Sequence, residues 1–413
     1  MTTRVRPDVV VVGGGVIGLS VAWKAAHAGL TVTLADPRPG RGAGWAAAGM
    51  LAPVGEAHFG EDALTALNVG AARAWPGFAL ALQEASGRSV HYVTDGTLLI
   101  AADPSDRAAV DDLLAYRLAL GLDAHRLTAG QCRSSEPLLA PGIRGGAHLS
   151  EDHQVDNRCV LDALVDACTA GGVTIVEEEV DVIEVEGDAI AGVTLRHGGH
   201  LPAGAVVLAA GCRSGQLRGI PDRLLPPVRP VKGLTLRLRA PAGARTLART
   251  VRGLVHGRSC YLVPRQDGTV VVGATVEEKG FDLAVQAGPV GDLLDDARRL
   301  VPSLEEYELF DTTTGLRPGS PDNAPIVGAT DIRGLVVATG HYRNGFLLAP
   351  VTAREVVGIL TGGDASDRHE GAGAAGGKVP LGAFAPFGPG RFTTAGASAV
   401  RPTDGSDVSR VGA

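Results

Sequence analysis

Lysine is scarce in this sequence, with only four residues among 38 basic ones: Lys24, Lys232, Lys279 and Lys378. Such a chain offers little for chemistry that proceeds through a lysine Schiff base. No run approaches the ~18 apolar residues that a membrane-spanning helix needs, so we expect no stable membrane insertion. The formal charge of −7 provides no basic field for polyphosphate, which argues against nucleic acid as a partner.

Cysteine is also sparse. The five residues form no CxxC pair and are odd in number: Cys132, Cys159, Cys168, Cys212 and Cys260. This pattern indicates a reducing cytoplasm and no structural metal site. Neither a GxSxG nor an HExxH motif occurs, which argues against a hydrolase of either type.

Glycine, in contrast, is abundant. It supplies 58 of 413 residues, about twice the usual share, whereas aromatic residues supply only 4%. This glycine serves either tight turns that bring the backbone close to a ligand or a disordered, low-complexity tail. The length allows two or three domains with a large core.

The beginning of the chain predicts a βαβ unit. A buried strand over 8–12 leads into a glycine turn, a helix to about 28 and a second strand over 30–35 that ends at Asp36. The turn reads Gly13-x-Gly15-x-x-Gly18, the pattern of a dinucleotide site in which Asp36 accepts from ribose hydroxyls. The alternative is a glycine turn without a nucleotide, and the motif itself does not separate FAD from NAD.

Helical and strand-like patterns alternate further along the chain. We expect helices near 61–85, 105–120, 157–171, 290–300 and 344–360, and strands near 90–101, 173–186, 189–197, 201–209, 231–238, 259–263, 269–274, 304–313 and 335–338. From 363 to 413 the Gly, Ala and Pro content predicts a mostly flexible tail. Within it, Phe384, Phe387 and Phe392 could dock on the folded part.

Several segments are more specific than these patterns. They are AAAGMLAP at 46–53, DGTLLIA at 95–101, PVKG at 230–233, YLVPRQDGTVVVGAT at 261–275, GLRPGSPDNAPIVG at 315–328 and ATGHYRNGFLLAP at 338–350. In this order the chain resembles the D-amino acid oxidase superfamily of flavoproteins, and in particular the glycine oxidases of thiamine biosynthesis. LGAFAPFGPGRF at 381–392 is similar to that family's C-terminal segment.

The resemblance implies an α/β fold that is α+β in its second domain. A Rossmann-type FAD-binding domain would be discontinuous, built from 1–85, 142–220 and 330–362. A substrate-binding domain with an antiparallel sheet would take 86–141 and 221–329.

The resemblance also implies a substrate site. Arg317 of the GLRP motif would bind the substrate carboxylate, and a guanidinium fork suits that task better than a lysine. Tyr261 would hydrogen-bond the same carboxylate, Arg343 would approach substrate and flavin, and Met50 and Val276 would line a small pocket. The alternatives are a surface ion pair for Arg317 and an ordinary core or edge-strand position for Tyr261.

The implied FAD contacts cover the nucleotide and the isoalloxazine ring. They are Gly13, Gly15, Val16, Ile17, Gly18, Asp36, Pro37, Ala43, Gly44, Ala48, Gly49, Met50, Val182, Gly211, His341, Tyr342, Arg343, Asn344, Gly345, Phe346 and Leu347. For His341 we expect a backbone contact rather than a role for the ring. The N-terminus of the helix that begins near 344 would stabilise reduced flavin.

The function implied is FAD-dependent oxidative deamination of glycine or another small amino acid. Hydride transfer to flavin N5 would give an imino acid, then glyoxylate and ammonia, with hydrogen peroxide formed from oxygen. The imine could instead pass to a thiazole synthase. FAD would be non-covalent, since no late cysteine follows Cys260, and the protein a homo-oligomer, a tetramer by resemblance.

Alternatives to this function remain open. One is an oxidase or dehydrogenase for sarcosine or a small D-amino acid, and another is a flavin-binding sensor or assembly protein without turnover. Thr313-Thr314 replaces the tryptophan-alanine pair usual before GLRP in the family. Thr313 could enlarge or polarise the pocket, which bears on the preference for glycine.

Overall fold

The structure, a computed structural model, describes residues 6–363, 380 and 382–392. A six-stranded sheet forms one half of the molecule. Its strands, in spatial order, are β18 (Ile326–Ala329), β19 (Leu335–Thr339), β12 (Ala205–Leu208), β1 (Val9–Val12), β2 (Val32–Ala35) and β8 (Thr174–Val176). All pairings are parallel except that of β18 with β19. The continuous valines of β1 are buried on both faces, as parallel strands require.

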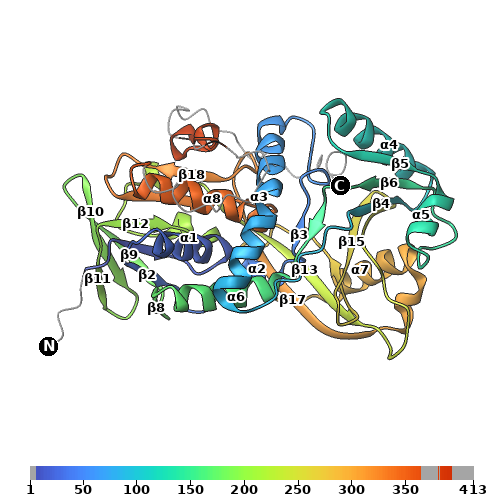
Figure 1. Cartoon of the computed structure of the whole chain (residues 1–413), viewed down its shortest axis with the longest axis horizontal. Coiled ribbons are helices and arrows are strands. Elements are labelled where there is room, and N and C mark those ends of the chain that lie inside the picture. Colours follow the sequence, from blue (N-terminus) through green and yellow to red (C-terminus); the bar gives the residue numbers. More distant parts are fainter. Residues whose placement is uncertain (1–5, 364–379, 381, 393–413) are drawn as a thin grey trace.

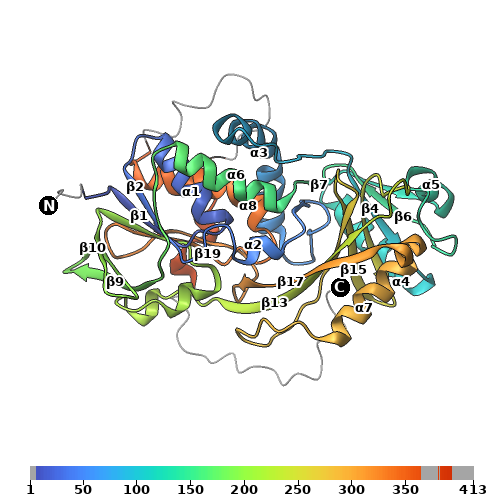
Figure 2. The same ribbon diagram turned by 90° about the horizontal axis from the view of Figure 1, so that it is seen from below.

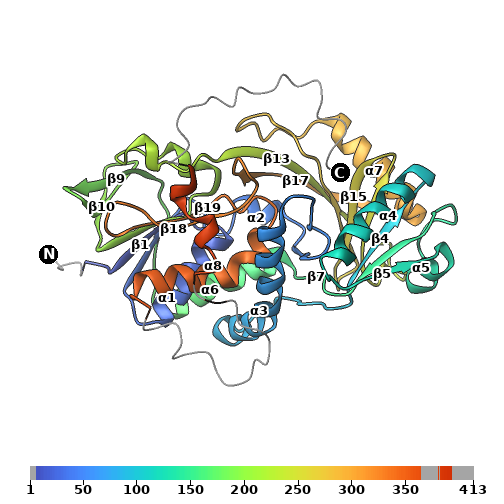
Figure 3. The same cartoon turned by 90° about the horizontal axis from the view of Figure 1, so that it is seen from above.

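The two faces of this sheet are covered differently. Val9 and Val11 point into a core shared with four helices, which lie together in Figures 1 and 3: α1 (Val16–His27), α3 (Asp62–Ser86), α6 (Asn157–Ala170) and α8 (Gly345–Leu360). Val10 and Val12 point into a second core under a three-stranded sheet of β9 (Val180–Glu186), β10 (Ala189–Leu195) and β11 (His200–Pro202). Because successive side chains of a strand point to opposite faces of the sheet, β1 contributes alternate valines to the two cores.

An eight-stranded sheet forms the other half. Its order is β17 (Glu308–Gly319), β13 (Arg229–Arg239), β16 (Thr269–Gly273), β15 (Arg258–Pro264), β14 (Thr250–Val255), β4 (Thr97–Ala101), β6 (Gly146–Leu149) and β5 (Ala124–Leu127). Three helices accompany it: α4 (Pro104–Ala119), α5 (Ala129–Ser135) and α7 (Ala287–Leu300). The long strands β13 and β17 run side by side from the α1 half towards the α7 half (Figure 2).

Shorter elements complete the fold. They are α2 (Ala43–Ala46), the pair of β3 (Met50–Leu51) with β7 (His153–Gln154), and 3₁₀ turns at 211–216, 222–224, 302–306, 385–387 and 389–392. Phe384 and Phe387 are buried in the core beside α8, so the predicted docking of this segment is observed for both. The rest of the predicted flexible tail, apart from Gly363, Pro380 and 382–392, lies outside the described residues.

The α/β fold class with a second, antiparallel-rich sheet agrees with the sequence-based prediction. The predicted domain ranges remain a proposal, and the sheets differ from them at two strands. β6 pairs in the eight-stranded sheet although it lies in 142–220, and β18 pairs in the six-stranded sheet although it lies in 221–329. Among the described residues, no helix is long and apolar enough to cross a membrane.

Candidate active site

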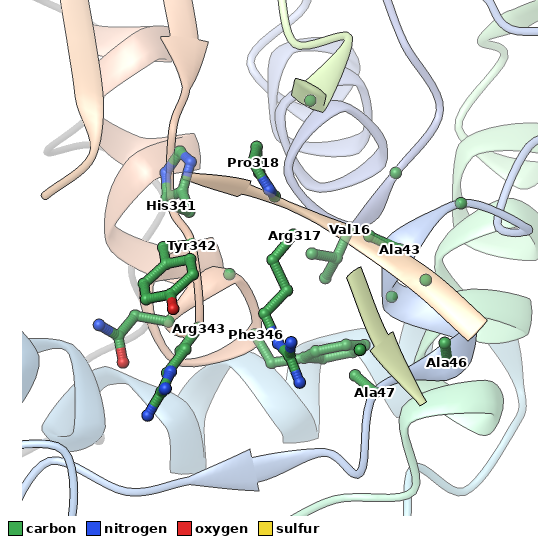
Figure 4. A pocket seen from close by; sticks show the side chains of 18 of the residues that line it. Val16, Ala43, Ala46, Ala47, Arg317, Pro318, His341, Tyr342, Arg343 and Phe346 are labelled. Atoms are coloured by element: carbon green, nitrogen blue, oxygen red, sulfur yellow. The ribbon is translucent and has the colours of Figure 1, made fainter. Parts of the chain in front are cut away.

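A pocket opens between the two halves, and most of the predicted site residues line it. They are Gly13, Gly15, Val16, Ile17, Asp36, Ala43, Gly44, Ala48, Gly49, Met50, Gly211, Tyr261, Val276, Arg317, His341, Tyr342, Arg343, Asn344, Gly345 and Phe346. Figure 4 shows Arg317 reaching into this space between Arg343 and Tyr342 on one side and Ala46 and Ala47 on the other. Residues more than 300 positions apart in the chain therefore meet at one site.

The three motif glycines have different physical roles. Gly13 has a φ of +105°, and a Cβ there would lie 2.5 Å from the Ala209 carbonyl oxygen. A Cβ on Gly18 would lie 1.8 Å from the Gly13 carbonyl oxygen, so this glycine lets α1 pack on the strand. Gly15 has nothing within 4 Å of its Cβ position. Its backbone thus faces open space in the pocket, where a pyrophosphate can approach.

The N-termini of two helices end at this pocket. Gly15 caps α1 and Asn344 caps α8, and neither makes a side-chain capping hydrogen bond. The free N–H groups and the partial positive charge of each terminus are suited to anionic groups. A dinucleotide, whose central pyrophosphate lies apart from its electron-accepting ring, can meet one helix end with each group.

Asp36 lies at the nucleotide end of the pocket. Its two oxygens accept from the backbone N–H groups of Gly14 and Arg38, each at 2.7 Å. The carboxylate thus holds the glycine turn, and its remaining lone pairs are available to ribose hydroxyls.

Arg317 lies on β17 opposite Val231 of β13. Its Nη1 donates to the carbonyls of Thr275 at 3.0 Å and Lys232 at 3.4 Å. A Cβ on Gly233 would lie 2.4 Å from both Nη1 and Nη2, so the guanidinium rests directly on this glycine of the PVKG motif. Burial and the nearby Arg343 lower the pKa of Arg317, but a guanidinium remains charged in proteins.

Tyr261, on β15, also packs against a glycine of the neighbouring strand. A Cβ on Gly273, its partner on β16, would lie 2.4 Å from the Tyr261 hydroxyl. Burial raises the pKa of Tyr261 although Arg317 opposes the shift, so the phenol stays protonated and can donate a hydrogen bond. Two glycines thus make room for the two side chains predicted to bind a carboxylate.

Two charged residues of the pocket were not predicted from the sequence. Glu56 and Arg252 line it and form an ion pair, with Glu56 Oε1 2.7 Å from Arg252 Nη2. Glu56 Oε2 also lies 3.8 Å from Arg343 Nη1. Glu56 follows the AAAGMLAP segment by three positions, which was its only signal. Arg252 lies on β14, a strand that the sequence patterns did not predict.

His341 is buried near the start of α8. Its Nε2 lies 3.0 Å from the Thr352 hydroxyl, whereas Nδ1 has no hydrogen-bond partner among the described residues. Burial lowers its pKa to about 3, so the ring is neutral at physiological pH. A neutral, buried ring is compatible with the predicted backbone contact, which stays a prediction.

Four predicted FAD contacts do not line the pocket: Gly18, Pro37, Val182 and Leu347. Gly18 and Leu347 are packed inside the core, Pro37 is exposed, and Val182 lies on β9, where it bridges to Arg218. The expected influence of Thr313 on the pocket is wrong. Its hydroxyl lies 3.1 Å from both the Arg158 guanidinium and Asp311, outside the pocket lining.

The AAAGM segment is held in place by Arg265, the last residue of the YLVPR motif. Its Nη2 donates to the Ala48 carbonyl at 2.6 Å, and Nη1 donates to Gln154 Oε1 at 2.9 Å. Asn157 Nδ2 donates to the Gly44 carbonyl at 2.8 Å. These bonds anchor a backbone of small residues along one wall of the pocket.

A nucleotide cradle in one pocket with Arg317 and Tyr261 is the arrangement of a dinucleotide-dependent oxidoreductase, and sequence similarity identifies the class. The profile of the family "FAD dependent oxidoreductase" matches residues 8–359, and the chain belongs to this family. FAD is accordingly the cofactor that the cradle serves. The glycine turn, the open space at Gly15 and the two uncapped helix ends fit such a group.

The similar proteins include glycine oxidases. The one from Geobacillus kaustophilus is 33% identical over 361 residues, which cover 86% of this chain and 93% of that protein. Its solved structure has a TM-score of 0.80 at 32% identity and covers 87% and 95% of the two chains. The "Bifunctional protein ThiO/ThiG" of Trichormus variabilis is also 33% identical, but the chain spans about half (52%) of its length.

Proposed function

We propose that the protein oxidises glycine, or another small amino acid, in an FAD-dependent reaction with oxygen. The observation that carries this proposal is the meeting of Arg317 and Tyr261 in the pocket that holds the nucleotide cradle. A cation and a neutral phenol on adjoining surfaces form a site for one carboxylate. Glycine oxidases at 33% identity support the assignment.

The two residues hold the substrate by its carboxylate. Both backbone bonds of Arg317 use Nη1, which leaves Nη2 and Nε for a ligand. Tyr261 would donate a hydrogen bond from its phenolic hydroxyl to the same carboxylate. A fixed carboxylate orients Cα and its amine. This orientation raises the rate, because the entropy cost of bringing the reacting groups together has been met on binding.

FAD would be held by the Gly13–Gly18 turn and Asp36 at one end and by the start of α8 at the other. Bound there, it supplies the two-electron acceptor for the substrate and is returned to the oxidised state by oxygen, with release of hydrogen peroxide. The net reaction converts glycine, oxygen and water to glyoxylate, ammonia and hydrogen peroxide.

Among the described residues, none that lines the pocket beside Arg317 and Tyr261 is a strong proton acceptor. His341 has a pKa near 3 and its ring is turned towards Thr352. The positive charges of Arg317 and Arg343 instead favour a substrate whose amine is neutral. Met50 and Val276 would restrict the substituent on Cα to a hydrogen or a small group.

FAD binding is proposed to be non-covalent. Cys212 lines the pocket, but burial raises the pKa of its thiol, which makes it a poor nucleophile at neutral pH. We also propose that the protein works in the cytoplasm, assembles as a homo-oligomer and passes its imine to a thiazole synthase. The last point is supported by the bifunctional relative.

The test is product analysis with purified protein in air. Glycine should give equal amounts of glyoxylate, ammonia and hydrogen peroxide. If sarcosine or D-alanine is oxidised and glycine is not, the substrate is wrong while the reaction class stands. If no amine produces peroxide or reduces the flavin, the protein is a flavin-binding protein without turnover.

A further inference from the structure

The substrate end of the pocket carries more positive than negative charge. Arg252, Arg317 and Arg343 all line it. Among the described lining residues, the only carboxylates are Glu56 and Asp36, and Asp36 belongs to the nucleotide end. Glu56 is therefore the one negative side chain that shares this end of the pocket with three guanidinium groups.

Glu56 contacts two of these arginines. Its Oε1 lies 2.7 Å from Arg252 Nη2, and its Oε2 lies 3.8 Å from Arg343 Nη1. The side chain is only 11% exposed, and that of Arg252 is 10% exposed, so solvent screens the pair weakly. His58 Nε2 lies 3.7 Å from Oε2, and the buried Arg117 is a further charged neighbour that interacts electrostatically with Glu56.

A second set of bonds fixes the turn that presents Glu56. Asp152 Oδ1 accepts from the Val54 N–H at 2.8 Å, and Oδ2 accepts from the Gly55 N–H at 2.9 Å. Arg117 Nη2 donates to the Gly55 carbonyl at 2.8 Å. A Cβ on Gly55 would lie 2.4 Å from Asp152 and 2.6 Å from Arg252, so the turn is closely surrounded.

We propose that Glu56 is a positioning and specificity residue, which orients Arg343 and Arg252 and makes the pocket select amino acids over carboxylates that lack an amine. This inference rests on the proposed function. Without Glu56, three positive charges would face the ligand, which favours any simple carboxylate. With it, the net positive charge is lower by one, and an ammonium group can enter beside the bound carboxylate.

Glu56 is not suited to accept the substrate proton. Although burial raises its pKa, Arg252, His58 and Arg343 hold the pKa of Glu56 well below its usual range. Such a carboxylate is a weak base. Its influence on the amine is electrostatic, since a nearby negative charge stabilises the ammonium form and so raises the pKa of the substrate amine.

The experiment is Glu56→Gln, with Glu61→Gln as the matched control, because Glu61 lies five positions on and does not line the pocket. Glycolate, which has the carboxylate of glycine but a hydroxyl in place of the amine, is the probe. Its dissociation constant is read from the change it causes in the absorbance of the FAD-loaded protein. Flavin content is measured for each variant.

We expect Glu56→Gln to bind glycolate on the order of tenfold more tightly and to raise the KM for glycine on the order of tenfold. The acid limb of the kcat profile should move to lower pH, since the amine in the complex loses its proton more easily. Glu61→Gln should change none of these values. Glu56→Asp, which retains the charge, should keep glycolate affinity close to that of the unchanged protein.

Equal changes in the same direction for glycolate and glycine would overturn the proposal and leave Glu56 a structural residue. A fall in kcat without a shift of the pH limb would also overturn it, since that result marks a proton acceptor. If glycine does not reduce the FAD of the unsubstituted protein at all, the proposed function fails. The glycolate titration then still decides whether Glu56 sets the charge of the carboxylate site.

Discussion

Replacing Gly233 with alanine should disable the site without unfolding the protein. The new Cβ would lie 2.4 Å from Nη1 and Nη2 of Arg317 and 2.5 Å from Cζ. An ordinary contact begins near 3.4 Å, so the guanidinium must move by about 1 Å. Because the three nearest atoms all belong to the far end of a long side chain, β13 itself need not move.

A displacement of this size near reacting groups reduces rates by roughly a hundredfold. We therefore expect kcat/KM for glycine to fall about a hundredfold in Gly233→Ala, with a large rise in KM, while flavin content and Tm stay close to those of the unchanged protein. Steady-state peroxide formation and thermal unfolding measure these two quantities. Gly142→Ala is the control, since nothing lies within 4 Å of its Cβ position.

A double-mutant cycle isolates the cause. If Gly233→Ala acts by moving the guanidinium, it should have little further effect in an Arg317→Ala background. An equal loss in both backgrounds would refute the reasoning, as would a Gly233→Ala protein with unchanged affinity for glycolate. A large fall in Tm would show instead that the backbone of β13 had been forced apart.

Arg317→Lys should raise the KM for glycine at least a hundredfold, because a lysine cannot present two parallel donors, and an unaltered KM would remove Arg317 from the carboxylate site. Phe387→Ala should lower the free energy of unfolding by about 3–5 kcal/mol, since Phe387 is buried beside α8. Leu80→Ala, at a 57% exposed position, should change the free energy of unfolding little. Equal effects of the two substitutions in urea unfolding would contradict the docking of Phe387. The pKa of His341 is about 3 in the folded protein and about 6.5 in the unfolded protein. The free energy of unfolding is therefore highest above pH 6.5 and falls as the pH falls, by about 2 kcal/mol at pH 5, because the unfolded state binds the proton more tightly. The free energy of unfolding of His341→Asn should depend less on pH than that of the unsubstituted protein.

The nucleotide half of the site was accessible from sequence because its signals are local. The glycines at 13, 15 and 18 and the carboxylate at Asp36 belong to one strand–turn–helix–strand unit, and each has a steric or hydrogen-bonding role there. Such a unit can be predicted from a short window of sequence. The same locality explains why the helices near 61–85 and 157–171 were placed to within a few residues.

The substrate half was predictable only through resemblance. Arg317 and Tyr261 are on strands that meet through β13 and β16, and nothing in the spacing of the two residues indicates this. The packing of these two side chains on Gly233 and Gly273 depends on strand register, which sequence patterns do not determine.

Residues that act through long-range ion pairs were missed altogether. Glu56 and Arg252 are separated by almost 200 positions, and neither has a distinctive local pattern. The error over Thr313 has a related cause. Its position before the GLRP motif suggested a pocket residue, but its hydroxyl meets Arg158 and Asp311.

In the proposed function, Arg317 and Tyr261 present an amino acid to bound FAD. The most direct test is the absorbance of the FAD-loaded protein during an anaerobic titration with glycine. We predict that glycine bleaches the oxidised flavin band and that this reduction is lost in Arg317→Ala. A flavin spectrum that glycine leaves unchanged, or one that is reduced equally well without Arg317, would contradict the account.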